Sequence, residues 1–226
     1  MPNWMYNGLT IEGNPDEVTK LVEQMNTPFV DYIKANGDLA YSVKQIKYPN
    51  PIFSFRNIVA PTDMEAYKFQ PTFPEKFDMN FEGNDWYNFN NREWGTKWDV
   101  AVSEDNKFSN TYMEGPTPNG ENLVVYYNFE TAWSRPLPAL QKLSAQYQTL
   151  LFTLSYEEET GWGGELEILR GVIISESEYE NKCKDCDGYD TLDYCEDCEN
   201  EVCSACGYGN EEAEANKCPL HAKENA

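Results

Sequence analysis

The feature that most constrains this chain is the placement of its sulfur and imidazole side chains. All seven cysteines lie between residues 183 and 218, and the only histidine in the protein follows them at 221. They form four pairs, each with two residues between its members, in the pattern C-x2-C-x8-C-x2-C-x4-C-x2-C-x11-C-x2-H. The eight side chains belong to Cys183, Cys186, Cys195, Cys198, Cys203, Cys206, Cys218 and His221.

This ligand count predicts two zinc ions. Two tetrahedral structural sites need eight nitrogen or sulfur ligands, and pairs with two intervening residues are typical of such sites. A disulfide framework would leave one cysteine unpaired and the histidine without a role, and the first residues show no basic region followed by an apolar stretch, which a secretory signal would have. We therefore expect an acidic zinc-binding module at residues 176–226, with two structural Zn²⁺ ions as its cofactors.

Two pairings of these ligands are open, sequential and interleaved. The four-residue spacer between Cys198 and Cys203 favours the interleaved one, since a short connection suits two pairs that belong to different ions. The stretch YCEDCENEVCSAC also resembles the middle of a B-box zinc finger, although the spacer before Cys218 is longer than in that family. The interleaved scheme gives one ion Cys183, Cys186, Cys203 and Cys206, and the other ion Cys195, Cys198, Cys218 and His221.

Neither ion is expected to be catalytic. Four protein ligands leave no open coordination position, so no bound water can be activated. A segment this short cannot fold on apolar burial alone, and a structural zinc site supplies on the order of 10 kcal/mol.

The charge of the chain limits its partners. The formal net charge is −22, of which −11 belongs to the last 51 residues. An acidic surface repels nucleic acid and anionic membranes, so we expect a protein partner, in particular a basic one, unless the acidic residues serve only solubility. No apolar run approaches the roughly 20 residues that span a bilayer, which predicts a cytoplasmic protein.

The rest of the chain predicts one α+β domain at residues 1–175. A region rich in prolines and isolated aromatics, about 27–91, is interpreted as an insertion with a strand at 52–59 and a helix at 84–91. Without it, the order is β-α-β-β-α-β, the ferredoxin-like sandwich with both helices on one face of the sheet. The strands of this order are predicted at 4–12, 97–103, 123–131 and 149–156, and its helices at 15–26 and 137–147. A final strand at 165–174 leads out of the domain.

Four motifs give a family resemblance over about 170 residues. They are MPNWMYN at 1–7, WGTKWD at 94–99, YYNFETAWSRPLP at 126–138 and LSYEEETGWGG at 154–164. Together they resemble the Api92-like (YubB) family of phage and plasmid proteins, from which this chain departs at Arg135. The resemblance implies a ferredoxin-like fold, an origin in a mobile element and residence in the host cytoplasm. The family has no established activity, and the cysteine-rich tail looks like an addition to its domain.

Polar residues accompany tryptophans in these motifs. If 97–103 and 123–131 are neighbouring antiparallel strands, the start of the first and the end of the second lie at one edge of the sheet. This predicts a ligand pocket there. The structural alternative is that the tryptophans are core or lid residues and that Lys97 pairs with Asp99. The predicted pocket residues are Asn3, Asn7, Lys97, Asp99 and Trp133.

Three functions are compatible with these features. No nucleophile elbow, Walker loop or dinucleotide fingerprint is present, so we expect a non-enzymatic protein that acts through protein–protein interaction, with the zinc module as a docking element. The first alternative is a small enzyme or ligand-binding protein that uses the tryptophan-lined edge. The second is an acidic decoy of a nucleic-acid-binding protein.

Overall fold

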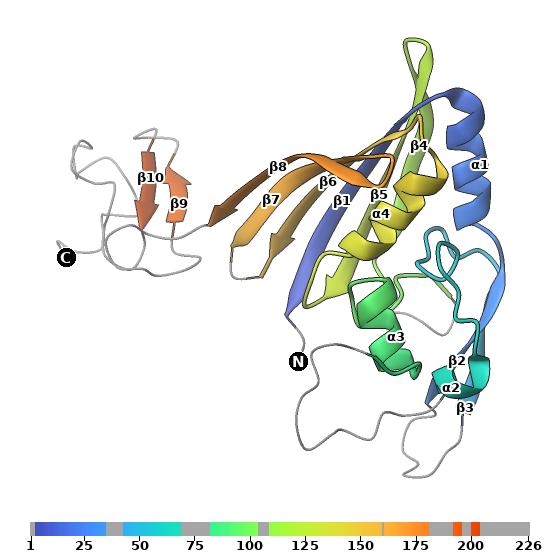
Figure 1. Cartoon of the computed structure of the whole chain (residues 1–226). Helices are drawn as coiled ribbons and strands as arrows, with labels where there is room; N and C mark the ends of the chain where they lie inside the picture. Colours follow the sequence, from blue (N-terminus) through green and yellow to red (C-terminus); the bar gives the residue numbers. More distant parts are fainter. Residues whose placement is uncertain are drawn as a thin grey trace. The chain divides into compact units, whose positions relative to one another are not determined.

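The computed structural model describes residues 3–34, 43–68, 82–103, 109–159, 161–180, 192–195 and 200–203 (Figure 1). The chain divides into two compact units, Met1–Tyr156 with Glu165–Ser177, and Glu157–Gly164 with Glu178–Ala226. The elements are β1 (Trp4–Gly13), α1 (Pro15–Met25), β2 (Phe29–Lys34), β3 (Val43–Tyr48), α2 (Met64–Lys68), α3 (Trp86–Glu93), β4 (Tyr112–Asn119), β5 (Asn122–Ala132), α4 (Leu137–Gln146), β6 (Leu151–Glu158), β7 (Trp162–Leu169), β8 (Val172–Glu180), β9 (Leu192–Cys195) and β10 (Asn200–Cys203).

The main sheet has six strands in the order β4-β5-β1-β6-β7-β8. β5 pairs antiparallel with both β1 and β4, and Trp4 lies opposite Ala132 in the first of these pairs. The strands β1, β4, β5 and β6, with α1 and α4, form the βαββαβ unit, so the predicted ferredoxin-like α+β fold is confirmed. β7 and β8 extend the sheet beyond β6.

The helix α1 forms as its sequence predicts. The side chain of Asn14 accepts hydrogen bonds from the backbone N–H groups of Asp16 and Glu17, and Pro15 occupies the first turn. Its buried residues recur at helical spacing and face the core. The buried side chains of α4 and the alternate buried residues of β1 complete that core, with α1 and α4 on the same side of the sheet (Figure 1).

The insertion covers the same side of the sheet, over β5. Residues 52–59 are bends and turns, so the strand predicted there is wrong. Phe53 stacks on Phe129 with ring centroids 5.1 Å apart, and Phe55 meets Phe129 edge-on at 5.9 Å. The apolar residues of this segment are therefore anchors that fill the core from a loop, which gives the same apolar pattern as a buried strand.

Two further predictions of strands need correction. Residues 97–103 form no strand, and the hairpin partner of β5 is β4, although prolines and glycine such as those of β4 are typical of a loop. The pairing register shifts between Glu114 and Thr117, and an edge strand tolerates proline there. The strand predicted at 165–174 is two strands, because Arg170 and Gly171, both with positive φ, form a tight turn between β7 and β8. The hairpin of β2 and β3 was not predicted.

Candidate functional site

The six strands of the main sheet contain ten glutamates and no lysine or arginine. Because side chains alternate along a strand, some of these glutamates lie on the face of the sheet opposite the helices, here called the open face. On β7, for example, Glu165 and Glu167 alternate with the buried Leu166 and Ile168. Within the first compact unit, the open face carries the glutamates Glu12, Glu114, Glu130, Glu165 and Glu167 and the tyrosines Tyr6, Tyr112 and Tyr126.

The tyrosines of the open face are accessible from solvent. Tyr6 is 47% exposed and Tyr112 is 45% exposed. Tyr112 lies beside Tyr126, with ring centroids 6.3 Å apart. Tyr126 crosses over Gly8, where a Cβ atom would come within 2.8 Å of the tyrosine hydroxyl. A side chain at position 8 would therefore displace the Tyr126 hydroxyl from its place over β1.

Two carboxylates of the open face, Glu12 and Glu130, are held by amides instead of cations. Glu130 Oε1 accepts a hydrogen bond of 2.7 Å from Asn110, and Glu12 Oε1 accepts bonds of 3.0 and 3.1 Å from Asn119 and Asn122. These amides orient the carboxylates without neutralising them. The face presents fixed negative charge next to exposed aromatic rings.

A second group of residues lies where β1 begins and β5 ends. The Nζ atom of Lys97 is 4.5 Å from the ring centroid of Trp98 and 4.6 Å from that of Trp133. Burial lowers the pKa of Lys97. Trp4 extends the group beside Trp98 at 6.0 Å, and Tyr87 extends it beside Trp133 at 6.4 Å. Lys97 and Trp133 were predicted to lie at one edge of the sheet, and the structure brings them into contact.

Several hydrogen bonds fix the backbone around this lysine. Trp94 is fully buried and donates its indole N–H to the carbonyl of Val59 at 3.0 Å. Thr96 Oγ1 donates to the carbonyl of Ala132 at 3.1 Å, and Ser134 Oγ donates to the carbonyl of Gly95. The loop after α3 is thus tied to the end of β5.

The other predicted pocket residues have separate roles. Asn3 contributes its carbonyl, which accepts from the backbone N–H of Trp133 at 2.9 Å. Asn7 is 1% exposed and donates to Thr131 Oγ1 at 3.0 Å, while its Oδ1 has no partner among the described residues. The structure therefore does not gather the five predicted residues in one cavity.

Asp99 binds residues 54–56 of the insertion to the segment that follows α3. Its carboxylate accepts hydrogen bonds from Ser54 Oγ at 2.6 Å and from the backbone N–H groups of Phe55, Arg56 and Val100 at 2.9, 3.2 and 2.7 Å. Burial raises the pKa of Asp99, and these four hydrogen bonds oppose the rise. Asp99 binds the 54–56 turn instead of Lys97.

Arg135 is also bound within the fold. Its guanidinium lies 4.6 Å from the ring centroid of Tyr156 and forms an ion pair of 2.7 Å with Glu176. It therefore joins the segment before α4 to β6 and β8.

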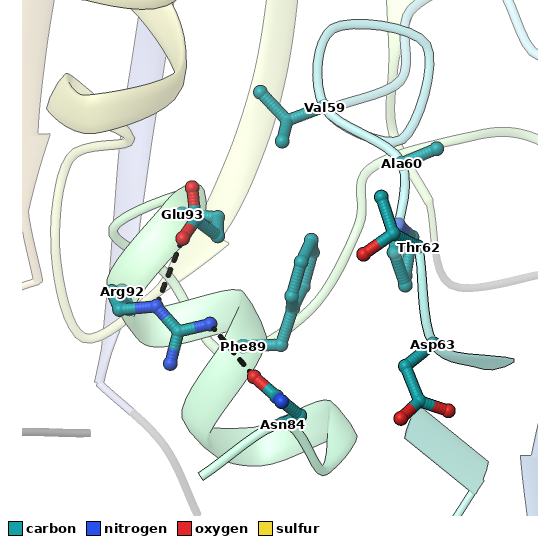
Figure 2. A pocket seen from close by; sticks show the side chains of 9 residues that line it. Val59, Ala60, Thr62, Asp63, Asn84, Phe89, Arg92 and Glu93 are labelled. Atoms are coloured by element: carbon teal, nitrogen blue, oxygen red, sulfur yellow. Dashed lines mark hydrogen bonds and ion pairs between the residues drawn. The ribbon is translucent and has the colours of Figure 1, made fainter. Parts of the chain in front are cut away.

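A small pocket of about 230 Å³ lies between α3 and residues 59–63 (Figure 2). Arg92 points along its wall, but its guanidinium is bound to Glu93 Oε1 at 2.8 Å and to the carbonyl of Gly83 at 2.8 Å. Ligand pockets usually exceed about 300 Å³. The size of this pocket and the occupied arginine argue against a ligand site here.

Glu93, which lines this pocket, makes pH-dependent contacts with Lys142 and Arg92 that can be tested. Burial tends to raise the pKa of Glu93, but hydrogen bonds from Lys142 and Arg92 hold this pKa below its ordinary value of 4.5. A lowered pKa in the folded state means that the contact stabilises the fold above pH 4.5 and is lost as the pH falls through the folded-state pKa. We expect Glu93→Gln to lower the free energy of unfolding by about 1 kcal/mol at pH 7.

Urea unfolding of Glu93→Gln and wild type between about pH 7 and pH 3 measures this effect. The difference between the two proteins should shrink on acidification. Glu23→Gln, at an exposed position on α1, is the control and should match wild type throughout. A difference that is independent of pH would show that Glu93 acts only through packing.

Most of the predicted zinc ligands lie outside the described residues: Cys183, Cys186, Cys198, Cys206, Cys218 and His221. Cys195 and Cys203 lie in the described hairpin, where Cys195 is opposite Asn200 and Cys203 is opposite Leu192. They are three residue steps apart along the ladder, or about 10 Å. Both open pairings assign Cys195 and Cys203 to different ions, so this register is compatible with either. The described residues include no other cluster of metal-ligating side chains.

In the part of the chain that the structure describes, no helix has both the length and the apolarity needed to cross a bilayer.

The family comparison agrees with this fold. A family model described as the ferredoxin-like domain in Api92-like protein matches residues 96–209. This range includes the first six cysteines, so it does not support the expectation that the tail is an addition to the domain. A crystal structure of a protein api92 from Yersinia pseudotuberculosis is 10% identical, with a TM-score of 0.44, and the match covers 79% of this chain and 98% of that one. No curated protein matches. Since the family model covers half of the sequence, the chain belongs to the family of the ferredoxin-like domain in Api92-like protein.

Proposed function

We propose that this chain is a non-enzymatic binding protein whose open face docks a basic protein partner. The observation that carries the proposal is the composition of the sheet, which has ten glutamates and no lysine or arginine. A solvated surface that serves only solubility normally mixes both signs of charge. An acid-only face with exposed tyrosines is complementary to lysine and arginine side chains.

The chemistry of the open face favours protein over other partners. Carboxylates such as Glu114 and Glu130 attract cationic side chains, and the faces of Tyr6 and Tyr112 receive them through cation–π contacts. The same carboxylates repel phosphate groups, which disfavours nucleic acid and anionic lipid. Binding of this kind weakens as salt screens the charges.

The zinc module is the second part of the proposal. We propose that the eight cysteine and histidine ligands bind two structural Zn²⁺ ions and so fold an acidic module. With a net charge of −11 over the last 51 residues, this module would add to the attraction for a basic partner. The spacing of the ligands supports it, as does the hairpin of β9 and β10 between Leu192 and Cys203.

The test of the docking surface uses a short peptide of alternating lysine and serine as a probe. NMR of the intact chain during titration should show the largest amide shifts on β1, β4 and β5. We expect the double variant Glu114→Lys with Glu130→Lys to weaken binding at least about tenfold, because two attractions become repulsions.

The matched control is Glu23→Lys with Glu82→Lys, which changes the net charge equally at exposed positions outside the sheet. It should retain most of the affinity. A second peptide, with glutamate in place of lysine, should not bind. Equal weakening by both double variants would show that only the net charge matters, and shifts confined to the tail would move the docking surface there.

A further inference from the structure

We infer that Trp98 and Trp133 form a cation-binding cage whose present occupant is the chain's own lysine. The Nζ atom of Lys97 lies at nearly the same distance from both indole centroids, 4.5 and 4.6 Å. Such distances are those of a cation held between two aromatic faces. The lysine therefore shows directly that the two rings are spaced to hold an ammonium group.

The rings of the cage are open to incoming ligands. Trp98 is 39% exposed and Trp133 is 45% exposed, although large aromatic side chains are usually buried. Trp4 and Tyr87 lie beside them and widen the aromatic surface. Aromatic side chains that serve only to pack the core are seldom exposed together in this way.

Trp133 has an unusual backbone conformation, which the surrounding hydrogen bonds hold in place together with the position of the ring. Trp133 has a φ of 73°, in the left-handed region that bulky residues rarely adopt. The carbonyl of Asn3 holds its N–H at 2.9 Å, and Ser134 is tied to Gly95. Strained residues of this kind cluster where the placement of a side chain serves binding.

The contacts of the Lys97 ammonium group within the described part of the chain are with the two rings. Among the described residues, no oxygen accepts a hydrogen bond from its Nζ atom and no carboxylate pairs with it. Displacement of Lys97 by a ligand therefore breaks no hydrogen bond or ion pair among the described residues. The displaced ammonium group regains its hydration in water. A methylated ammonium is more weakly hydrated than a primary one, so it competes well for the same position. The ligand class is thus a quaternary or methylated ammonium group, such as a trimethyllysine side chain.

The test measures binding of N-acetyl-trimethyllysine amide to the intact chain, followed by the indole N–H signals in NMR. Lys97→Met keeps the length of the stem but removes the competing charge. We expect it to bind at least about tenfold more tightly than wild type, since the internal competitor is gone. Lys20→Met, an equal change of charge at an exposed position on α1, should bind as wild type does.

Two comparisons make the result decisive. The neutral carbon analogue, with a tert-butyl group in place of trimethylammonium, should bind far more weakly, and Trp133→Ala or Trp98→Ala in the Lys97→Met background should abolish binding. Equal binding of the neutral analogue would reduce the site to an apolar patch and overturn the inference. Absence of binding to both wild type and folded Lys97→Met would also overturn it. The inference does not depend on the open face, because the small ligand tests the cage separately from the lysine-serine peptide.

Discussion

Asp99→Ala is expected to lower the free energy of unfolding by about 3 to 5 kcal/mol, because it leaves several buried donors without an acceptor. The carboxylate accepts from Ser54 Oγ and from the N–H groups of Phe55, Arg56 and Val100. Ser54, Phe55 and Val100 are buried, so water cannot replace the lost acceptor freely. The expected cost exceeds that of any single exposed ion pair.

The measurement is urea unfolding followed by tryptophan fluorescence, with fits that hold the m-value to that of wild type. Trp94 is a suitable reporter, because its indole N–H donates to Val59 in the same insertion. Asp63→Ala is the matched control. It removes one hydrogen bond, from the N–H of Ala66 at 3.0 Å, and should cost about 1 kcal/mol. Equal losses in the two variants would contradict the central role of Asp99.

The fold was predictable where local chemistry and the global fold agree. The Asn14-Pro15 start of α1 and the apolar spacing that follows specify a helix on their own. The alternation from Trp4 onward likewise specifies β1. These elements, with β5, α4 and β6, are five of the six elements of the βαββαβ order, and the sixth, β4, was predicted at the wrong place, residues 97–103.

Prediction failed where tertiary contacts override local pattern. The alternation of Trp98, Val100 and Val102 resembles a strand, but the segment is fixed by the hydrogen bonds of Asp99 and not by a ladder. Conversely, Gly115 and the prolines of β4 resemble a loop, and only pairing with β5 makes this segment a strand.

The candidate sites were predictable in part. Lys97 and Trp133 were placed together, although the reason given, a strand that begins at Lys97, was wrong. Asn7 and Asp99 were assigned to the same pocket because sequence does not show which polar residue turns inward. The open face was missed, yet its signal was present, since no strand of the sheet contains lysine or arginine.

The zinc module gives the second large expected effect. We expect native mass spectrometry of the purified chain to find two Zn²⁺ ions, and a strong chelator to remove both. Because each structural site supplies on the order of 10 kcal/mol, the tail should then lose its dispersed NMR signals while the sheet and α1 retain theirs. A chain purified without zinc, with dispersed tail signals, would contradict the assignment of the ligands.

Paired substitutions then decide between the two pairing schemes. Cys183→Ser should cost one ion under either scheme, because three remaining ligands hold zinc far more weakly than four. Adding Cys203→Ser removes no further ion if these cysteines share a site, as in the interleaved scheme, but removes the second ion if pairing is sequential. Cys183→Ser with Cys195→Ser gives the reverse outcome and serves as the matched control. We expect one retained ion in the first double variant and none in the second. The opposite result would establish the sequential pairing in place of the interleaved one. A loss of both ions in each variant would mean that neither site folds without the other.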